Sequence, residues 1–243
     1  MHGQRTTSLG QATLGCVGFF RMIPSSRARL KRQSAQHFPG ETLFARVARV
    51  VCEAECLPRK ELFESWEVAR RVRRRFRGGR VVDLACGHGL VAWLMLLLDD
   101  TSPSALGTDA RLPASAARLG EAMATSWPRL AGRVALAEGR VEDAALGPGD
   151  VVVSAHACGA LTDVVLDLAA RAGARVAVLP CCHDEATCDA GSLAGWLDAP
   201  LAIDVTRARR LASLGYEVHT QQIPEAITPK NRLLLGAPRG ARA

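Results

Sequence analysis

The chain has 243 residues, 48% of them hydrophobic, and its 31 lysine and arginine residues exceed its 24 aspartate and glutamate residues, which gives a formal net charge of +7. This composition excludes an intrinsically disordered chain and is typical of one globular domain with a small appendage. The 8 cysteines occur mostly in pairs or near histidine. In a chain with so much apolar patterning they do not indicate a disulfide scaffold, and they favour a reducing, cytoplasmic location.

The first part of the chain is basic and then becomes helical. Residues 1–38 contain arginine and lysine but no acidic residue, which predicts a basic, disordered tail. Residues 39–78 are expected to form a helical segment, because apolar residues recur at helical spacing on both sides of Pro58. The remaining residues, 79–243, are expected to form the main domain.

Apolar strands alternate with helices in this main domain. The expected strands are RVVDLAC, SALGTDA, RVALAEG, DVVVSAHA and RVAVLPCC. Because they are almost wholly apolar, they predict an α/β, Rossmann-like fold with a mostly parallel, doubly wound sheet. After residue 202 a helix, TRARRLASLG, precedes two strands joined by a loop, which predicts an antiparallel C-terminal pair. The run LVAWLMLLL is about half of a membrane span, so no membrane partner is expected.

The first strand ends in a glycine-containing turn, DLACGHGLVA, from Asp83 to Ala92. Glycines at a strand end let the backbone approach a ligand, and the following helix points its amides at that ligand. Gly87 and Gly89, followed by Asp109 at the end of the next strand, also satisfy the dinucleotide-binding pattern. On their own, these glycines therefore leave NAD as an alternative.

The acid in this turn favours a different cofactor. The carboxylate of Asp83 would repel a pyrophosphate but attract the ammonium and sulfonium groups of S-adenosylmethionine, and D-x-A-x-G-x-G is the spacing of class I methyltransferases, with Ala85 at the usual first glycine. Asp109 is expected to accept hydrogen bonds from the ribose hydroxyls. In the string RVED, Val141 is expected to contact the adenine through its backbone, and Glu142 to offer a polar edge. A plain nucleotide-binding or dehydrogenase fold is the alternative.

Five strings, VVDLACGHG, HACGALTD, LPCCH, AIDVTRARRLASLGYEV and ITPKNRLLLGAP, resemble in this order a family of methyltransferases. The family includes the methyltransferase-like domain of the glutathione S-transferase C-terminal-domain-containing protein. HACGALTD and PCCH also resemble strings of the tRNA acceptor-stem 2′-O-methyltransferase, whose zinc-binding modules have no counterpart in this sequence. The likeness extends from about Arg80 to Pro238. It implies a class I methyltransferase that holds S-adenosylmethionine at these residues: Asp83, Gly87, Gly89 and Asp109.

The fourth and fifth strands end in reactive side chains, HAC and PCCH. His156 and Cys158 are the expected catalytic residues, with His156 as a base toward a hydroxyl acceptor. Three other interpretations stay open: a cysteine nucleophile, although the Asp-Ala-Pro-Cys string is missing; a zinc site, although finger spacing is missing; and close packing of small residues. The favoured interpretation is an acceptor pocket without a metal. Its expected substrate-binding residues are Asp163, Cys181, Cys182, His183, Lys230 and Asn231.

A basic block, RRVRRRFRGGR, precedes the first strand and ends at Arg80. On a helix, Val72 and Phe76 would face inward and most guanidinium groups would face solvent, where arginine suits phosphate. The sequence thus predicts a methyltransferase that acts on RNA (tRNA or rRNA) by direct methyl transfer. Two alternatives remain: a degenerate protein that binds the cofactor or nucleic acid without methyl transfer, and a small-molecule or protein methyltransferase.

Overall fold

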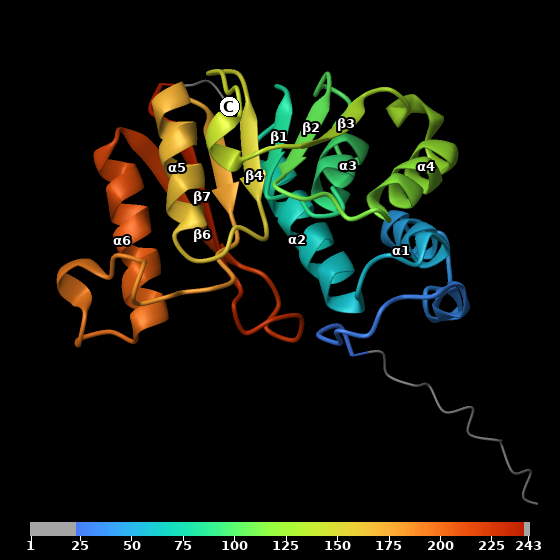
Figure 1. Ribbon diagram of the computed structural model, residues 1–243, viewed down its shortest axis with the longest axis horizontal. Helices are drawn as coiled ribbons and strands as arrows, with labels where there is room; N and C mark the ends of the chain where they lie inside the picture. Colours follow the sequence, from blue (N-terminus) through green and yellow to red (C-terminus); the bar gives the residue numbers. More distant parts are fainter. Residues whose placement is uncertain (1–22, 241–243) are drawn as a thin grey trace, which may run out of the picture.

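The computed structural model describes residues 23–240 and has a central sheet between two layers of helices (Figure 1). The sheet has seven strands in the order β3-β2-β1-β4-β5-β7-β6. Their bounds are β1 Val81–Leu84, β2 Ala105–Asp109, β3 Val134–Glu138, β4 Val151–Ser154, β5 Arg175–Val178, β6 Tyr216–Gln222 and β7 Arg232–Pro238. Strands β1 to β5 pair in parallel, and β7 runs antiparallel to both of its neighbours. The predicted fold is therefore confirmed.

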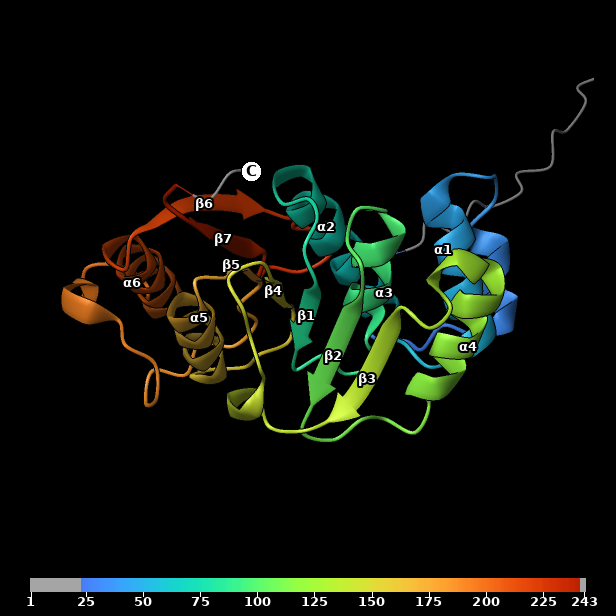
Figure 2. The same ribbon diagram turned by 90° about the horizontal axis from the view of Figure 1, so that it is seen from above.

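Alternate residues of the central strands face two separate cores. Val151 and Val153 belong to the core under helices α1 to α4, whereas Val152 between them belongs to the core under α5 and α6. Figure 2 shows α2 and α3 on one side of the sheet and α5 and α6 on the other. The helices are α1 Leu43–Ala54, α2 Arg59–Arg75, α3 Leu90–Leu97, α4 Ala116–Ser126, α5 Leu161–Ala172 and α6 Ala199–Ser213. Burial on both faces explains why the strands lack polar alternation.

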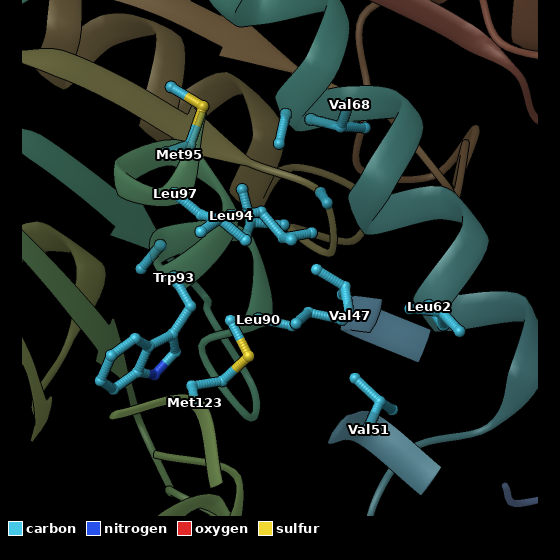
Figure 3. Packing of buried hydrophobic residues seen from close by; sticks show 14 of the residues in the cluster. Val47, Val51, Leu62, Val68, Leu90, Trp93, Leu94, Met95, Leu97 and Met123 are labelled. Atoms are coloured by element: carbon cyan, nitrogen blue, oxygen red, sulfur yellow. The ribbon is translucent and has the colours of Figure 1, made fainter. Parts of the chain in front are cut away.

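Helix α3 is the centre of the larger core (Figure 3). All eight of its residues are buried, and Val47 of α1, Leu62 of α2 and Met123 of α4 belong to the same cluster. The apolar run that contains α3 is thus a core helix. Among the helices of residues 23–240, none combines the length and the apolar character that crossing a bilayer requires.

The basic N-terminal stretch is packed over its described part. Leu30 is 1% exposed and Phe38 is 4% exposed. The Leu30 amide donates to the carbonyl oxygen of Leu57 at 2.9 Å, and the Phe38 ring lies edge-on to Phe44. The predicted tail over residues 1–38 therefore differs from the structure in its second half, because the apolar residues spaced along it bury against α1 and α2. Residues 1–22 of that tail lie outside the described residues.

The arginines of the basic block mostly form ion pairs. Val72 and Phe76 are buried as expected, and every arginine of the block except Arg73 is at least partly exposed. Arg73 is 2% exposed, lies 3.1 Å from the Asp99 carboxylate and donates to Ser102 and to the Met95 carbonyl oxygen. The other ion pairs of the block are Arg70 and Arg71 with Glu67, Arg75 with Glu217, Arg77 with Asp99, and Arg80 with Asp150. Three of these acids, Asp99, Asp150 and Glu217, are distant in sequence and are brought to the block only by the fold.

Replacing Arg73 should therefore cost stability rather than RNA affinity. Burial opposes ionisation of Asp99, yet hydrogen bonds from Thr101 and Gly78 together with Arg73 hold the pKa of that carboxyl at about 2. Arg73→Gln removes the close partner of this buried charge and leaves only the more distant Arg77, at 3.8 Å, so the free energy of unfolding should fall by about 3–5 kcal/mol. The exposed neighbour Arg74 provides the matched control. Arg74→Gln should change the free energy of unfolding by less than about 0.5 kcal/mol. Equal urea midpoints for the two variants would contradict this assignment.

Candidate functional site

The turn between β1 and α3 holds three residues in the left-handed backbone region. Ala85, Gly87 and Gly89 have φ values of 55°, 54° and 74°. For a residue with a side chain this conformation costs about 1–2 kcal/mol, so Ala85 is strained where glycine would not be. Backbone strain of this kind concentrates at ligand-binding and catalytic sites. The turn is thus a candidate binding element on structural grounds as well as by its sequence.

Asp83 lies under this turn instead of on its surface. Its side chain is 1% exposed, and its Oδ2 accepts a hydrogen bond from the Ala92 amide at 3.1 Å. Ala92 is the third residue of α3, so the carboxyl caps the helix from β1. Burial raises the pKa of Asp83 to about 8. Burial thus opposes ionisation of this carboxyl, and a bound cation would favour its ionised form.

The expected ribose-binding and adenine-binding residues follow the ends of β2 and β3. The Asp109 carboxylate accepts from the Gly87 amide at 2.8 Å and from the Arg111 amide at 3.1 Å. Val141 and Glu142 belong to a short 3-10 helix, Val141–Asp143, after β3. The Val141 side chain is buried, so a ligand could contact this residue only through its backbone. Glu142 is exposed, and its carboxylate lies 3.3 Å from the guanidinium group of Arg140. Strand ends β1, β2 and β3 thus carry the three predicted parts of one site.

The space above the turn tests whether S-adenosylmethionine fits. A Cβ added at Gly87 would meet no atom within 4 Å, whereas one added at Gly89 would lie 2.5 Å from Leu136. Gly87 therefore borders an open cradle, and Gly89 is required by packing. The buried carboxyl under the turn, Asp83, would be stabilised in its ionised form by a positive charge and would oppose a pyrophosphate. The donor set thus suits a cationic cofactor without phosphates.

A second hollow lies beside the turn, at the ends of β4 and β5. It has a volume of about 430 Å³ and is also bounded by the start of α2 and the loop between β6 and β7. In Figure 1 that loop (red) and the first described residues (blue) lie at the same end of the molecule. The lining residues that the sequence predicted are His156, Cys181, Cys182 and Lys230. We call this hollow the acceptor cavity.

His156 is the group in the acceptor cavity best suited to take a proton. Its Nε2 is buried and has no hydrogen-bond partner. Burial lowers the pKa of His156 below its ordinary value, although Glu64 opposes this effect. The imidazole is therefore neutral near pH 7. A neutral, unpartnered imidazole in a cavity can accept a proton or a hydrogen bond from an entering ligand.

Charged residues at the start of α2, which the sequence analysis did not single out, complete the cavity. Lys60, Glu61 and Glu64 line it, and Lys60 lies 2.5 Å from Glu64. Burial, followed by repulsion from Glu64, raises the pKa of Glu61 to about 7. Glu61 also lies 3.9 Å from His88 of the glycine turn, so it joins the two halves of the site. The i, i+3 and i, i+4 spacing that places Glu61 and Lys60 beside Glu64 on the helix was the available signal.

Three predicted substrate-binding residues lie elsewhere. Asp163 binds Arg207 through both carboxylate oxygens, at 3.0 and 2.7 Å. His183 is turned toward α6, where its Nε2 lies 2.8 Å from the Asp204 carboxylate. Asn231 closes the hairpin by donating to the Ile223 carbonyl oxygen at 3.0 Å. These contacts hold loops and helices together behind the cavity, although the Nδ1 of His183 is buried without a hydrogen-bond partner.

Cys158 meets the cysteines of the next strand end. Its Sγ lies 3.2 Å from that of Cys181, and the Cys181 and Cys182 Sγ atoms are 3.8 Å apart. Cys158 is exposed, whereas Cys181 and Cys182 are partly buried. The strings HAC and PCCH, 23 residues apart, therefore meet as parallel strand ends should.

Comparison with known proteins identifies the class. Residues 66–189, just over half of the chain, match a family described as Methyltransferase domain. The chain belongs to this family. The protein is accordingly a methyltransferase, and the family match leaves its acceptor unspecified. A search of the curated proteins found no match.

Solved structures share the fold at low sequence identity. An O-methyltransferase family protein from Burkholderia thailandensis is 18% identical with a TM-score of 0.50, and the match covers 90% of this chain and 67% of that one. The S-adenosylmethionine-dependent methyltransferase SibL is 19% identical with a TM-score of 0.50, over 86% of this chain and 66% of its own. This chain thus spans about two thirds of the length of each, and the likeness establishes the fold of this methyltransferase.

Filling the cradle at Gly87 should block the cofactor without unfolding the protein. Gly132 is a matched control, because it has φ of +74° and an added Cβ there also meets no atom within 4 Å. Gly87→Ala and Gly132→Ala should each cost about 1–2 kcal/mol of stability through left-handed strain. Only Gly87→Ala should weaken S-adenosylmethionine binding in calorimetry, by at least about tenfold. Equal affinities for the two variants, or comparable NAD binding by the parent, would contradict the assignment.

Proposed function

We propose that this methyltransferase acts on RNA (tRNA or rRNA) and that the acceptor enters the acceptor cavity. The observation that carries the proposal is the cavity itself, which joins the glycine turn through Glu61 and His88 and contains an unpartnered imidazole and basic side chains. The resemblance to the methyltransferase-like domain of the glutathione S-transferase C-terminal-domain-containing protein and to the tRNA acceptor-stem 2′-O-methyltransferase supports it. A cytoplasmic location is part of the same proposal.

The cofactor would be held across the ends of β1, β2 and β3. Gly87 leaves room for it, Asp109 would accept from its ribose hydroxyls, and the Val141 backbone with Glu142 would border its adenine. A cationic group bound near the turn would favour the ionised form of Asp83. When bound, S-adenosylmethionine supplies a methyl group on a sulfonium, which a nucleophile takes up by direct displacement. The chain contributes mainly by holding the acceptor in line with that methyl group.

His156 would remove a proton from the acceptor. Its Nε2 is buried and unpartnered, so an acceptor hydroxyl in the cavity would find a hydrogen-bond acceptor there. Because the lowered pKa keeps the imidazole neutral, it can take the proton as the hydroxyl becomes a nucleophile. Cys158 has no covalent step in this proposal, and Asp163 and His183 act only by positioning the surrounding loops.

The basic residues that would hold RNA phosphates are those of the cavity, not the arginine block. The block lies where the strands begin: Arg80 directly precedes β1, and its partner Asp150 directly precedes β4. The site lies where the strands end, at the other edge of the sheet. Arg27 and Lys230 line the cavity there and come from two separate segments, and a third cation, Lys60, is paired with Glu64. Converging cations of this kind suit the backbone of a nucleic acid.

Removing the imidazole should abolish methyl transfer and leave cofactor binding intact. His156→Ala should lower turnover at least about a hundredfold, since general-base catalysis contributes that much or more. His37, which is partly exposed and lies outside the acceptor cavity, provides the control variant His37→Ala. Turnover is measured with labelled S-adenosylmethionine and RNA from a strain that lacks this protein. In the parent, turnover should fall as pH is lowered through the depressed pKa of His156.

The pKa of Glu61, in the same cavity, is about 7, so this residue could also make turnover fall at low pH. The fall is assigned to His156 only if the Glu61→Gln variant shows it too. Full activity of His156→Ala would eliminate the base role. Transfer to a small molecule, with no labelling of RNA, would support the small-molecule alternative and leave the family assignment unchanged.

RNA affinity should depend on the cavity and not on the arginine block. Arg27→Gln with Lys230→Gln removes two charges at the cavity, and Arg74→Gln with Arg75→Gln removes two charges near the other edge. The first pair should weaken RNA binding and flatten the plot of log affinity against log salt by about 0.7 per lost phosphate contact. Titrations at several salt concentrations measure both slopes. A larger loss of RNA affinity in Arg74→Gln with Arg75→Gln would show that RNA binds at the arginine block instead.

A further inference from the structure

The three thiols at the ends of β4 and β5 form the most compact cluster of metal-binding groups in residues 23–240. The Sγ atoms of Cys158, Cys181 and Cys182 all lie within 4.8 Å of one another. The two shorter separations are 3.2 and 3.8 Å. Three sulfurs bound to one tetrahedral zinc ion at about 2.3 Å are about 3.8 Å apart, so the observed spacings lie around that value.

We propose that Cys158, Cys181 and Cys182 bind one zinc ion, with the fourth coordination position open toward the acceptor cavity. Each thiol would bind as a thiolate and release its proton to solvent. Cys181 and Cys182 line the cavity, and Cys158 is exposed, so an ion can reach the cluster without unfolding. Three protein ligands with one open position are the arrangement of zinc sites that bind a further ligand, whereas structural sites usually have four.

The backbone already holds the two cysteine-bearing segments together. The Gly159 amide, next to Cys158, donates to the Cys182 carbonyl oxygen at 3.2 Å. Arg207, which is 2% exposed, donates to the Gly159 carbonyl oxygen at 2.9 Å and thereby ties this segment to α6. The ligands are therefore positioned by hydrogen bonds that do not involve the thiols, and binding needs only small side-chain movements.

The charge around the cluster suits a bound ion with three thiolates. Such a complex carries a net charge of about −1, because three thiolates exceed the charge of the ion. Lys60 and Lys230, which line the same cavity, would offset it. Without a cation, three adjacent thiolates would repel one another, so the fully ionised cluster requires a bound cation. This inference concerns the metal alone and does not depend on an RNA acceptor.

Metal binding by the reduced full chain tests the proposal. The protein is stripped with a chelator, reduced with a phosphine, mixed with Zn²⁺ or Co²⁺ alone, and passed through a desalting column. We expect one zinc ion per chain by elemental analysis, and a sulfur-to-cobalt charge-transfer band for the cobalt form. Cys158→Ser and Cys181→Ser should each lose that band and weaken binding at least about tenfold. Cys52→Ala, which changes a buried cysteine of α1, should behave as the parent.

If a variant fails to fold, the proposal is still tested by the unsubstituted protein, because its cobalt spectrum alone shows whether the metal is bound by sulfur. A parent that stays metal-free would overturn the proposal, as would serine variants that are folded by circular dichroism and keep the band. Formation of a Cys158–Cys181 disulfide in air, with no zinc uptake by the reduced protein, would show that the cluster is a thiol pair instead. Failure of methyl transfer to RNA would leave these results unchanged.

Discussion

The hydrogen bond from the Ala92 amide to the buried carboxyl of Asp83 closes the turn on which both parts of the site depend. It anchors the start of α3 to β1, so the five residues between the two elements must turn back sharply. Three of them take left-handed backbone conformations, including the strained Ala85. The same turn leaves Gly87 open to a ligand and presents its amide to Asp109. Without this bond, α3 would lose its direction, and the larger core is packed around α3.

The parallel sheet gathers side chains that are far apart in sequence. Because β1 to β5 all end at one edge, the proposed cofactor side at β1 to β3 adjoins the proposed acceptor side at β4 and β5. Helix α2 spans the distance between the two edges. Its first turns carry Lys60, Glu61 and Glu64 into the cavity, and its last turn carries arginines to the opposite edge. One helix thus contributes charge to the site and stability to the edge where the strands begin.

Polar residues behind the acceptor cavity form a support that fixes its wall. Arg207 binds Asp163 and the Gly159 carbonyl oxygen, and Asp204 accepts from Arg232 at 2.7 Å and lies close to His183. These buried contacts hold the loops after β4 and β5, which carry His156 and the three cysteines. A wall held from behind can keep its reactive groups unpaired on the cavity side, as the Nε2 of His156 is. A bound zinc ion would add a second connection between the same loops.

The sequence by itself determined the fold, the glycine turn and the meeting of HAC with PCCH. Each of these follows from local spacing and from the rule that parallel strands end at one edge. Only the tertiary structure decided which charged side chains have an ion-pair partner. The acids that pair with Arg73, Arg75 and Arg80 are 26, 142 and 70 residues away, so no local pattern could show that these arginines are paired. The direction of Asp163 and His183 was likewise set by partners on α6, because a side chain at a strand end turns toward whichever charge the fold places beside it.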